Sequence, residues 1–176
     1  MTENKGPGLL AVFVGASGSG KSTLASAVFG PENVVSSDAL RLLVSGGAND
    51  QQATRDAFDL LHRIVAMRCK RQLVTAVDSV ALRAEHRAVF HMLAAVHGMP
   101  CVAIAVDTPL KMCLDRNAAR ERQVPEHVIR AQYQAFRRSL AVLPDEGFAD
   151  VFLVRTLARS TGQHVAELAE WLAGVA

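Results

Sequence analysis

The residues best suited to chemistry are eight consecutive positions near the N-terminus, Gly15-Ala16-Ser17-Gly18-Ser19-Gly20-Lys21-Ser22. They form a complete GxxxxGKS phosphate-binding loop that directly follows the apolar run 9–14. The glycines let a phosphate chain approach closely, so that successive backbone N–H groups form an anion nest. Lys21 supplies positive charge for the β- and γ-phosphates, and the Ser22 hydroxyl is placed to ligate Mg²⁺. The loop therefore predicts a binding site for a nucleoside triphosphate.

A second candidate pair, Asp38 and Arg41, comes just after the apolar run 33–36. In a phosphotransferase, an Asp at this point can accept the proton of an attacking hydroxyl. Arg41 is three residues further along a predicted helix, so it shares a face with Asp38 and is placed to hold an anion on the acceptor. Ser36-Ser37-Asp38 is also a good helix-capping sequence. Both interpretations stay open, and one turn can serve both roles.

Asp78 and three arginines are candidates for handling metal and phosphate. Asp78 ends the apolar run 73–78, where many phosphate-loop proteins place a carboxylate for Mg²⁺ or its water shell, although an Asp here can instead cap the next turn. Arg116, Arg120 and Arg122 lie where a predicted helix gives way to a loop, and one helical turn separates Arg116 from Arg120. We interpret them as a lid that closes on transferring phosphates, with a solvated arginine-rich surface as the alternative.

The elements that must position these residues alternate along the chain. Short runs rich in Val, Ile or Leu are typical of parallel strands covered on both faces. They are 9–14, 33–36, 73–78, 101–107 and 151–154. Helical patterns lie between them, over 51–72, 83–97 and 161–172 and in segments that begin near 21, 109 and 126. This order predicts an α/β fold in which helices flank a parallel sheet.

Length and composition fit a single domain that can bury a sizeable interior. The chain has 176 residues, half of them apolar, and a net charge of only +2, which neither requires nor excludes nucleic acid. Residues 1–8 lack the apolar core of a signal peptide, and no apolar run approaches membrane-spanning length, so we expect a cytoplasmic protein. Cys69, Cys101 and Cys113 are widely spaced and predicted to be buried, reduced thiols. His62 and His91 fall in helical patterns and are assigned no chemistry.

Together, these motifs resemble the N-terminal kinase module of the bacterial polynucleotide kinase-phosphatase repair enzymes. The resemblance runs from about Leu9 to about Thr156, with motifs in order and nearly at the family's spacing. Those motifs are the phosphate loop through Thr23, Ser36-Ser37-Asp38 with Arg41, Asn49-Asp50-Gln51, Ala57-Phe58-Asp59 with Leu61-His62, Val77-Asp78, Arg116-Asn117 with Arg120, and Arg122-Gln123-Val124. The family follows the strand-ending Asp with a Thr-Asn pair, whereas this chain has Asp78-Ser79-Val80, so its polar contacts to an acceptor differ.

The resemblance implies an adenylate-kinase-like P-loop NTPase fold with an arginine-bearing lid at about 116–138. It implies transfer of the ATP γ-phosphate to the 5′-hydroxyl of a DNA or RNA end, with Mg²⁺ as cofactor. The 176 residues would form a single kinase domain, with a flexible segment 1–8. The chain would be either a stand-alone kinase or the N-terminal domain of a larger repair enzyme, with phosphatase and ligase functions in partner domains or proteins.

The same resemblance assigns roles to individual residues. Lys21 and Ser22 handle the triphosphate and Mg²⁺, and Asp38 activates the 5′-hydroxyl. Arg41 grips the phosphate of the terminal nucleotide, while Arg116 and Arg120 close from the lid. The nucleotide-binding set comprises positions 15–23 with Arg116 and Arg122. A kinase of a sugar, nucleoside or antibiotic hydroxyl is the alternative, and a nucleotide-switched binding protein agrees less well with the acceptor-side pair.

Overall fold

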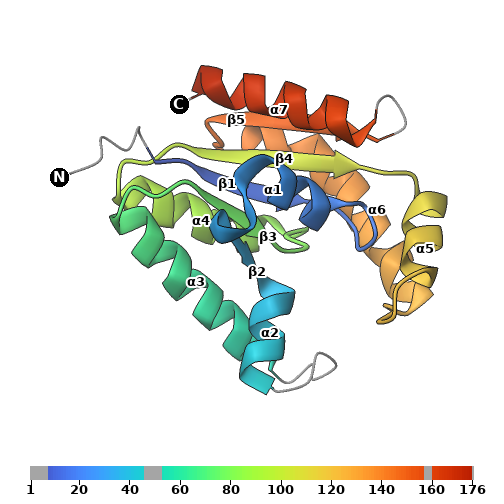
Figure 1. Ribbon diagram of the computed structural model, residues 1–176. Helices are drawn as coiled ribbons and strands as arrows, with labels where there is room; N and C mark the ends of the chain where they lie inside the picture. The colour runs from blue at the N-terminus through green and yellow to red at the C-terminus, as the bar shows by residue number, and fades with distance from the viewer. Residues whose placement is uncertain (1–7, 46–52, 157–159, 176) are drawn as a thin grey trace.

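The apolar runs predicted from the sequence form the strands of one parallel sheet (Figure 1). The computed structural model describes residues 8–45, 53–156 and 160–175. The strands are β1 (Leu10–Val14), β2 (Val34–Ser36), β3 (Thr75–Asp78), β4 (Cys101–Asp107) and β5 (Asp150–Arg155). They pair in the order β2-β3-β1-β4-β5, and every pairing is parallel. The predicted α/β architecture is confirmed.

Helices cover both faces of this sheet. They are α1 (Lys21–Phe29), α2 (Ser37–Ser45), α3 (Thr54–Lys70), α4 (Ala84–Val96), α5 (Leu110–Ala118), α6 (Glu126–Val142) and α7 (Thr161–Val175), with short 3₁₀ turns η1 (Pro31–Asn33) and η2 (Leu143–Asp145). The predicted helical segments agree with these bounds to within a few residues. Side chains of α1 and α7 pack on one face, and those of α3, α4 and α6 pack on the other (Figure 1).

The central strand β1 shows why the sheet needs two helical layers. Leu10, Val12 and Val14 point into the core shared with α3, α4 and α6, whereas Ala11 and Phe13 point toward α1 and α7. All five are fully buried, as expected for a parallel strand that has neighbours on both sides and helices on both faces. The expectation that each predicted run is covered on both faces is wrong for β5, which forms one edge of the sheet and leaves Leu153, within the run 151–154, exposed.

Because the strands are parallel, the segments that carry the candidate residues all lie at the carboxyl-terminal end of the sheet. The phosphate loop follows β1, Asp38 follows β2, Asp78 ends β3, and α5 follows β4. Because parallel strands all end at the same edge, these four segments become neighbours although they are spread over the chain. The fold therefore builds one site at the carboxyl ends of the strands.

The prediction that the three cysteines are buried and unpaired is confirmed. Cys69, Cys101 and Cys113 are buried and unpaired, and burial raises the pKa of the Cys101 thiol to about 12. His62 packs against the Phe90 ring at a centroid distance of 5.4 Å. No helix in the described ranges is long and apolar enough to cross a membrane. The motif Asn49-Asp50-Gln51 and nearly all of the segment 1–8 lie outside the described residues.

Candidate active site

Close packing and hydrogen bonds from the segment after β4 fix the conformation of the phosphate loop. Gly18 and Gly20 adopt φ values of 80° and 99°, which side chains disfavour. A Cβ at Gly18 would clash with the carbonyl oxygen of Cys113 in α5. The Ser19 carbonyl accepts hydrogen bonds from Thr108 Oγ1 at 2.8 Å and from Arg116 Nη1 at 3.1 Å. These contacts turn the Ser19 carbonyl toward Thr108 and Arg116.

Lys21 lies buried inside this loop, where its charge is poorly solvated. Its side chain is 7% exposed, and its Nζ donates a hydrogen bond to the Ala16 carbonyl oxygen at 2.8 Å. Burial lowers the Lys21 pKa to about 8, and the Asp78 carboxylate opposes that effect. Phosphate oxygens at this position favour the charged form of the lysine. A bound polyphosphate would therefore stabilise the charged form of Lys21.

Asp38 and Arg41 come together on the first turn of α2, as predicted. Arg41 Nη1 donates to Asp38 Oδ1 at 2.6 Å, and Arg41 Nε donates to Thr54 Oγ1 in α3 at 3.3 Å. The Asp38 side chain is 72% exposed, whereas that of Arg41 is 15% exposed. Because α2 begins at Ser37 directly after β2, Asp38 lies within the first turn and not at the capping position before it. This favours an acceptor-side role over capping.

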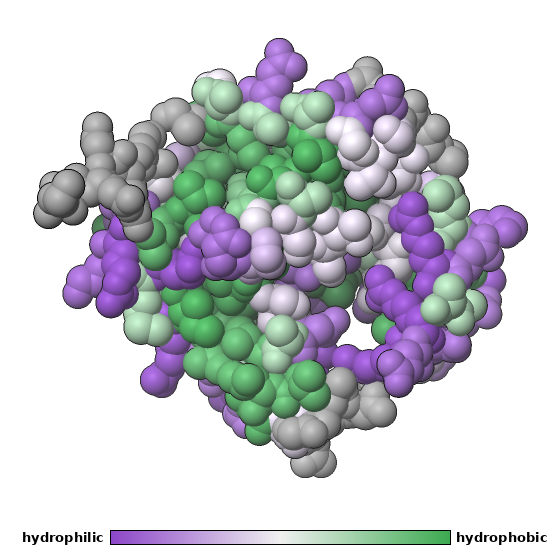
Figure 2. All heavy atoms as spheres, viewed as in Figure 1, coloured by the Kyte–Doolittle hydropathy of each residue, from purple (hydrophilic) through white to green (hydrophobic). Residues whose placement is uncertain are grey.

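A cavity of about 530 Å³ joins this pair to the phosphate loop. Its lining includes Ser17 and Ser22 from the phosphate loop and the start of α1, Asp38 and Arg41 from α2, and several residues between Arg120 and Val128. Figure 2 shows an opening on this side of the molecule that is rimmed by hydrophilic side chains. A smaller adjoining pocket brings together the predicted phosphate and metal residues Lys21, Ser22, Asp38, Asp78 and Arg120.

A second cavity, of about 540 Å³, lies on the other side of the phosphate loop. It is lined by Gly18 to Gly20 and Thr23, by Arg116 and Arg120, and by Val154 in β5, Thr156 just after it, and Thr161 and His164 in α7. Its position beside the loop fits the nucleoside end of a bound nucleotide. No sequence pattern marks the contribution of Thr156, Thr161 and His164, because hydroxyls and a histidine at irregular spacing are typical of any surface.

The three candidate arginines border these two cavities. The prediction that Arg116 and Arg120 lie one turn apart on the same helix is wrong, because α5 ends at Ala118 and Arg120 lies in the turn beyond it. Both nevertheless line the 540 Å³ cavity, and Arg120 also lines the 530 Å³ cavity with Arg122. The buried Asn117 side chain closes this turn. Its Oδ1 accepts a hydrogen bond from the Val124 N–H, and its Nδ2 donates one to the Val124 carbonyl, both at 2.9 Å.

Ser22 and Asp78 provide a donor set that fits Mg²⁺. Both line the small pocket beside Lys21, and hydroxyl and carboxylate oxygens are the ligands Mg²⁺ prefers. Within the described part of the chain, no group of three His, Cys, Asp or Glu side chains is arranged to hold a metal ion. This is consistent with Mg²⁺ being held by one or two protein oxygens together with substrate phosphates.

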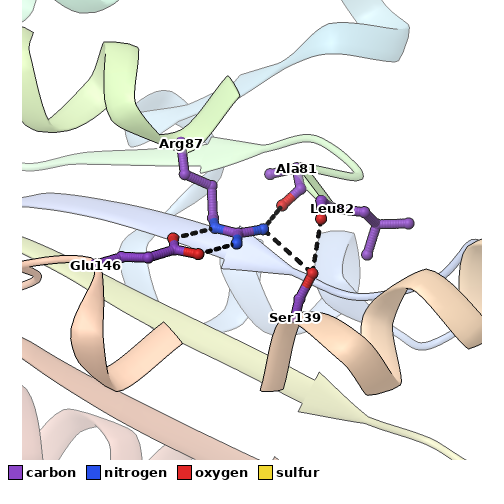
Figure 3. A network of polar contacts seen from close by, with 5 residues as sticks. All are labelled: Ala81, Leu82, Arg87, Ser139 and Glu146. Carbon is purple, nitrogen blue, oxygen red and sulfur yellow. Dashed lines mark hydrogen bonds and ion pairs between the residues drawn. The ribbon is translucent and has the colours of Figure 1, made fainter. Parts of the chain in front are cut away.

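A buried polar network, unmarked in the sequence, supports the loop that follows Asp78 (Figure 3). Arg87 in α4 is 1% exposed and binds Glu146 through two nitrogens, with Nε 2.6 Å from Oε2. Its Nη1 donates to the carbonyl of Ala81, which has a left-handed φ of 39°. Ser139 in α6 donates to the Leu82 carbonyl at 2.6 Å. An arginine in a helical pattern normally indicates a surface, so the sequence hides this role.

Comparison with known proteins agrees with the fold. Residues 10–143 match a family model described as an AAA domain. The chain is similar to the Mycobacterium tuberculosis APS kinase CysC in complex with AMPPNP and APS, at 21% identity and a TM-score of 0.64 over 95% of this chain and 98% of that one. A Janibacter sugar kinase gives 21% identity and 0.66 over 97% and 99%.

One similar structure comes from an RNA repair system. A chain of the Pnkp1/Rnl/Hen1 RNA repair complex gives 18% identity and a TM-score of 0.67 over 79% of this chain, which spans about half (47%) of that one. No curated protein matches the chain by sequence. At these identities the structural matches show the fold alone, which is the α/β P-loop NTPase fold of several kinases.

Proposed function

The chain belongs to the AAA domain family, and from that premise we propose that it is an ATP- and Mg²⁺-dependent kinase of polynucleotide 5′-hydroxyl ends. The observation that carries the proposal is the meeting of Asp38 and Arg41 with Ser17 and Ser22 of the phosphate loop in one cavity. A protein that only binds or hydrolyses a nucleotide does not need a carboxylate–guanidinium pair on the acceptor side of its phosphates.

Asp38 has the geometry of a general base for the acceptor hydroxyl. Its carboxylate is largely exposed, adjoins the Lys21 pocket, and keeps one oxygen on Arg41. The other oxygen is then available to accept the hydroxyl proton as attack on the γ-phosphorus begins. Lys21 and Arg120 neutralise charge on the transferring group, and positioning supplies most of the rate.

Arg41 has the geometry of a grip for an acceptor phosphate. Two of its nitrogens are fixed by Asp38 and Thr54. Its third nitrogen, Nη2, has no hydrogen-bond partner in the described ranges, and the side chain lines the 530 Å³ cavity. A guanidinium that is oriented by two bonds and offers a third donor suits a phosphate of the terminal nucleotide.

Mg²⁺ bound near Ser22 and Asp78 would supply charge neutralisation between the β- and γ-phosphates. A DNA or RNA end as acceptor is supported by the motif resemblance and by the structural match to a chain of an RNA repair complex. The same proposal includes phosphatase or ligase domains, or separate proteins, as partners of this chain. Arg116 and Arg122 are proposed to close over the nucleotide from the lid.

A small-molecule kinase is a second candidate, favoured by a specific observation. The APS kinase and the sugar kinase match over nearly their whole length, whereas the repair chain matches over less than half of its own. Val80, Val124 and Val128 also give the acceptor cavity apolar walls, which suit a compact ligand as well as a nucleoside.

One labelling experiment separates the candidates. The protein is incubated with γ-labelled ATP, Mg²⁺ and, separately, 5′-hydroxyl DNA, 5′-hydroxyl RNA, nucleosides and sugars. We expect label on the oligonucleotide 5′ ends, and we expect Lys21→Ala to remove it without unfolding the protein. Label on nucleosides or sugars only would transfer the assignment to the second candidate. No label on any of these acceptors would refute transfer to polynucleotides, nucleosides and sugars alike.

A further inference from the structure

One hydrogen bond to the phosphate loop comes from a residue 115 positions away in the chain. The backbone N–H of Ser17 donates to Oε1 of Gln132 in α6 at 2.9 Å. An N–H donor can pair only with the oxygen of a carboxamide, so this bond fixes which way the amide faces. The NH₂ group of Gln132 is therefore turned away from Ser17, and it has no hydrogen-bond partner among the residues that the structure describes.

The backbone beneath Gln132 is firmly anchored. Ile129 and Phe136, on the same side of α6, are fully buried in the core. Two turns further on, Ser139 bonds the Leu82 carbonyl and joins the Arg87 network (Figure 3). The Gln132 side chain is thus held at both ends, by a fixed helix and by the Ser17 N–H. Such a group is preorganised for a ligand and needs no rearrangement to meet one.

The free NH₂ group belongs to the cavity where phosphoryl transfer must occur. Gln132 lines the 530 Å³ cavity together with Ser17, Ser22 and Asp38. Lys21 and Ser22 fix the donor phosphates on one side, and Asp38 fixes the hydroxyl on the other. The transferring group must lie between them. A diphosphate ends at its β-phosphate and does not reach this point.

We propose that Gln132 binds the γ-phosphoryl group: its NH₂ donates to a γ-phosphate oxygen while its oxygen stays on the Ser17 N–H. The contact would distinguish ATP from ADP and tie the anchored helix α6 to the group being transferred. This inference rests on the proposed function in taking ATP as the phosphate donor and Asp38 as the residue that places the acceptor hydroxyl. It involves binding alone, and no bond forms or breaks at Gln132.

The test compares binding of ADP with binding of a non-hydrolysable ATP analogue, measured calorimetrically with Mg²⁺. Gln132→Glu keeps the side-chain length and an oxygen for Ser17, but it loses the NH₂ donor and adds negative charge. We expect it to weaken the analogue by roughly 10- to 100-fold and to change ADP affinity less than about threefold. Gln134→Glu makes the same charge change at an exposed position of α6 and should match wild type for both nucleotides.

Two results would overturn the proposal. Unchanged analogue affinity in Gln132→Glu would mean that the residue only tethers Ser17, and equal losses for both nucleotides would mean that it only supports the loop. Gln132→Ala, which should weaken the analogue alone by several-fold, decides the question if the Glu variant melts at a lower temperature than wild type. A protein that shows the expected difference in affinity yet labels no oligonucleotide would refute the polynucleotide acceptor and leave the Gln132 contact established.

Discussion

Replacing Asp38 by Asn separates catalysis from stability at the acceptor side of the site. The amide keeps the size of the carboxylate and can still accept a hydrogen bond from Arg41, whose Nη1 lies 2.6 Å from Asp38 Oδ1. It cannot accept the proton of an attacking hydroxyl. We expect phosphoryl transfer to fall by roughly two to four orders of magnitude, with nearly unchanged ATP affinity.

The stability change should be small because the ion pair is exposed. The Asp38 carboxylate is 72% exposed, and exposed pairs contribute about 0–1 kcal/mol. Its favourable position at the positive end of α2 contributes about 0.3–1 kcal/mol more. The free energy of unfolding should therefore fall by about 1 kcal/mol, which lowers the melting temperature by roughly 2–4 °C in a chain of this size. A loss of transfer a hundredfold or greater corresponds to at least about 2.7 kcal/mol in the barrier, so the two effects are easily distinguished.

The assay measures single-turnover transfer to a 5′-hydroxyl oligonucleotide beside thermal melting of the same preparation. Glu85→Gln is the matched control: Glu85 lies in the first turn of α4, is 68% exposed, and pairs with Arg83 away from the site. It should lose a similar amount of stability and no activity. An Asp38→Asn enzyme that keeps more than about half of its transfer rate would refute general-base catalysis by Asp38.

Three more predictions concern charge. Burial lowers the Lys21 pKa from 10.5 to about 8, so between these pH values the unfolded chain binds more protons than the folded one. The free energy of unfolding of the ligand-free protein should therefore rise by up to ~3 kcal/mol from pH 8 to 10.5. Urea denaturation across this pH range should show the rise in wild type and not in Lys21→Met. Arg41→Ala should lower kcat/KM about 10- to 100-fold for an oligonucleotide or a nucleoside 3′-phosphate, but not for an unphosphorylated nucleoside; equal losses on all acceptors would place Arg41 on the donor side. Arg87→Met should lower the free energy of unfolding by about 3–5 kcal/mol in urea denaturation, because it leaves the Glu146 carboxylate, 14% exposed, without its partner. The double variant with Glu146→Leu should recover part of that loss. An Arg87→Met protein as stable as wild type would contradict this.

The sequence was sufficient for the central part of the site because local pattern and topology both constrain it. The apolar run 9–14 and the glycines after it can hardly form anything other than a buried strand and a phosphate loop. Once parallel strands are accepted, Asp38 and Asp78 must lie at the same edge as Lys21, and all three border one small pocket. Residues tied to strand ends were thus predictable.

The remaining contacts were not predictable because they join segments far apart in the chain. Gln132 reaches Ser17 across 115 positions, and Arg87 reaches Glu146 across 59. Neither residue belongs to a motif, and a glutamine or arginine in an amphipathic helix ordinarily faces solvent. The second cavity depends on how α7 packs beside α1, which hydrophobic periodicity does not specify. The exposed edge at β5 likewise follows from strand order and not from composition.

The Arg87–Glu146 pair also has a consequence for the order in which the molecule folds. Arg87 lies in α4 and Glu146 follows η2, so the two charges are paired and shielded from water only when α4 packs against the end of α6 and η2. An intermediate that buried one charge without the other would be strongly disfavoured. We therefore expect α4, η2 and the end of α6 to consolidate late and to open together, so that their amide protons exchange with solvent as one cooperative unit.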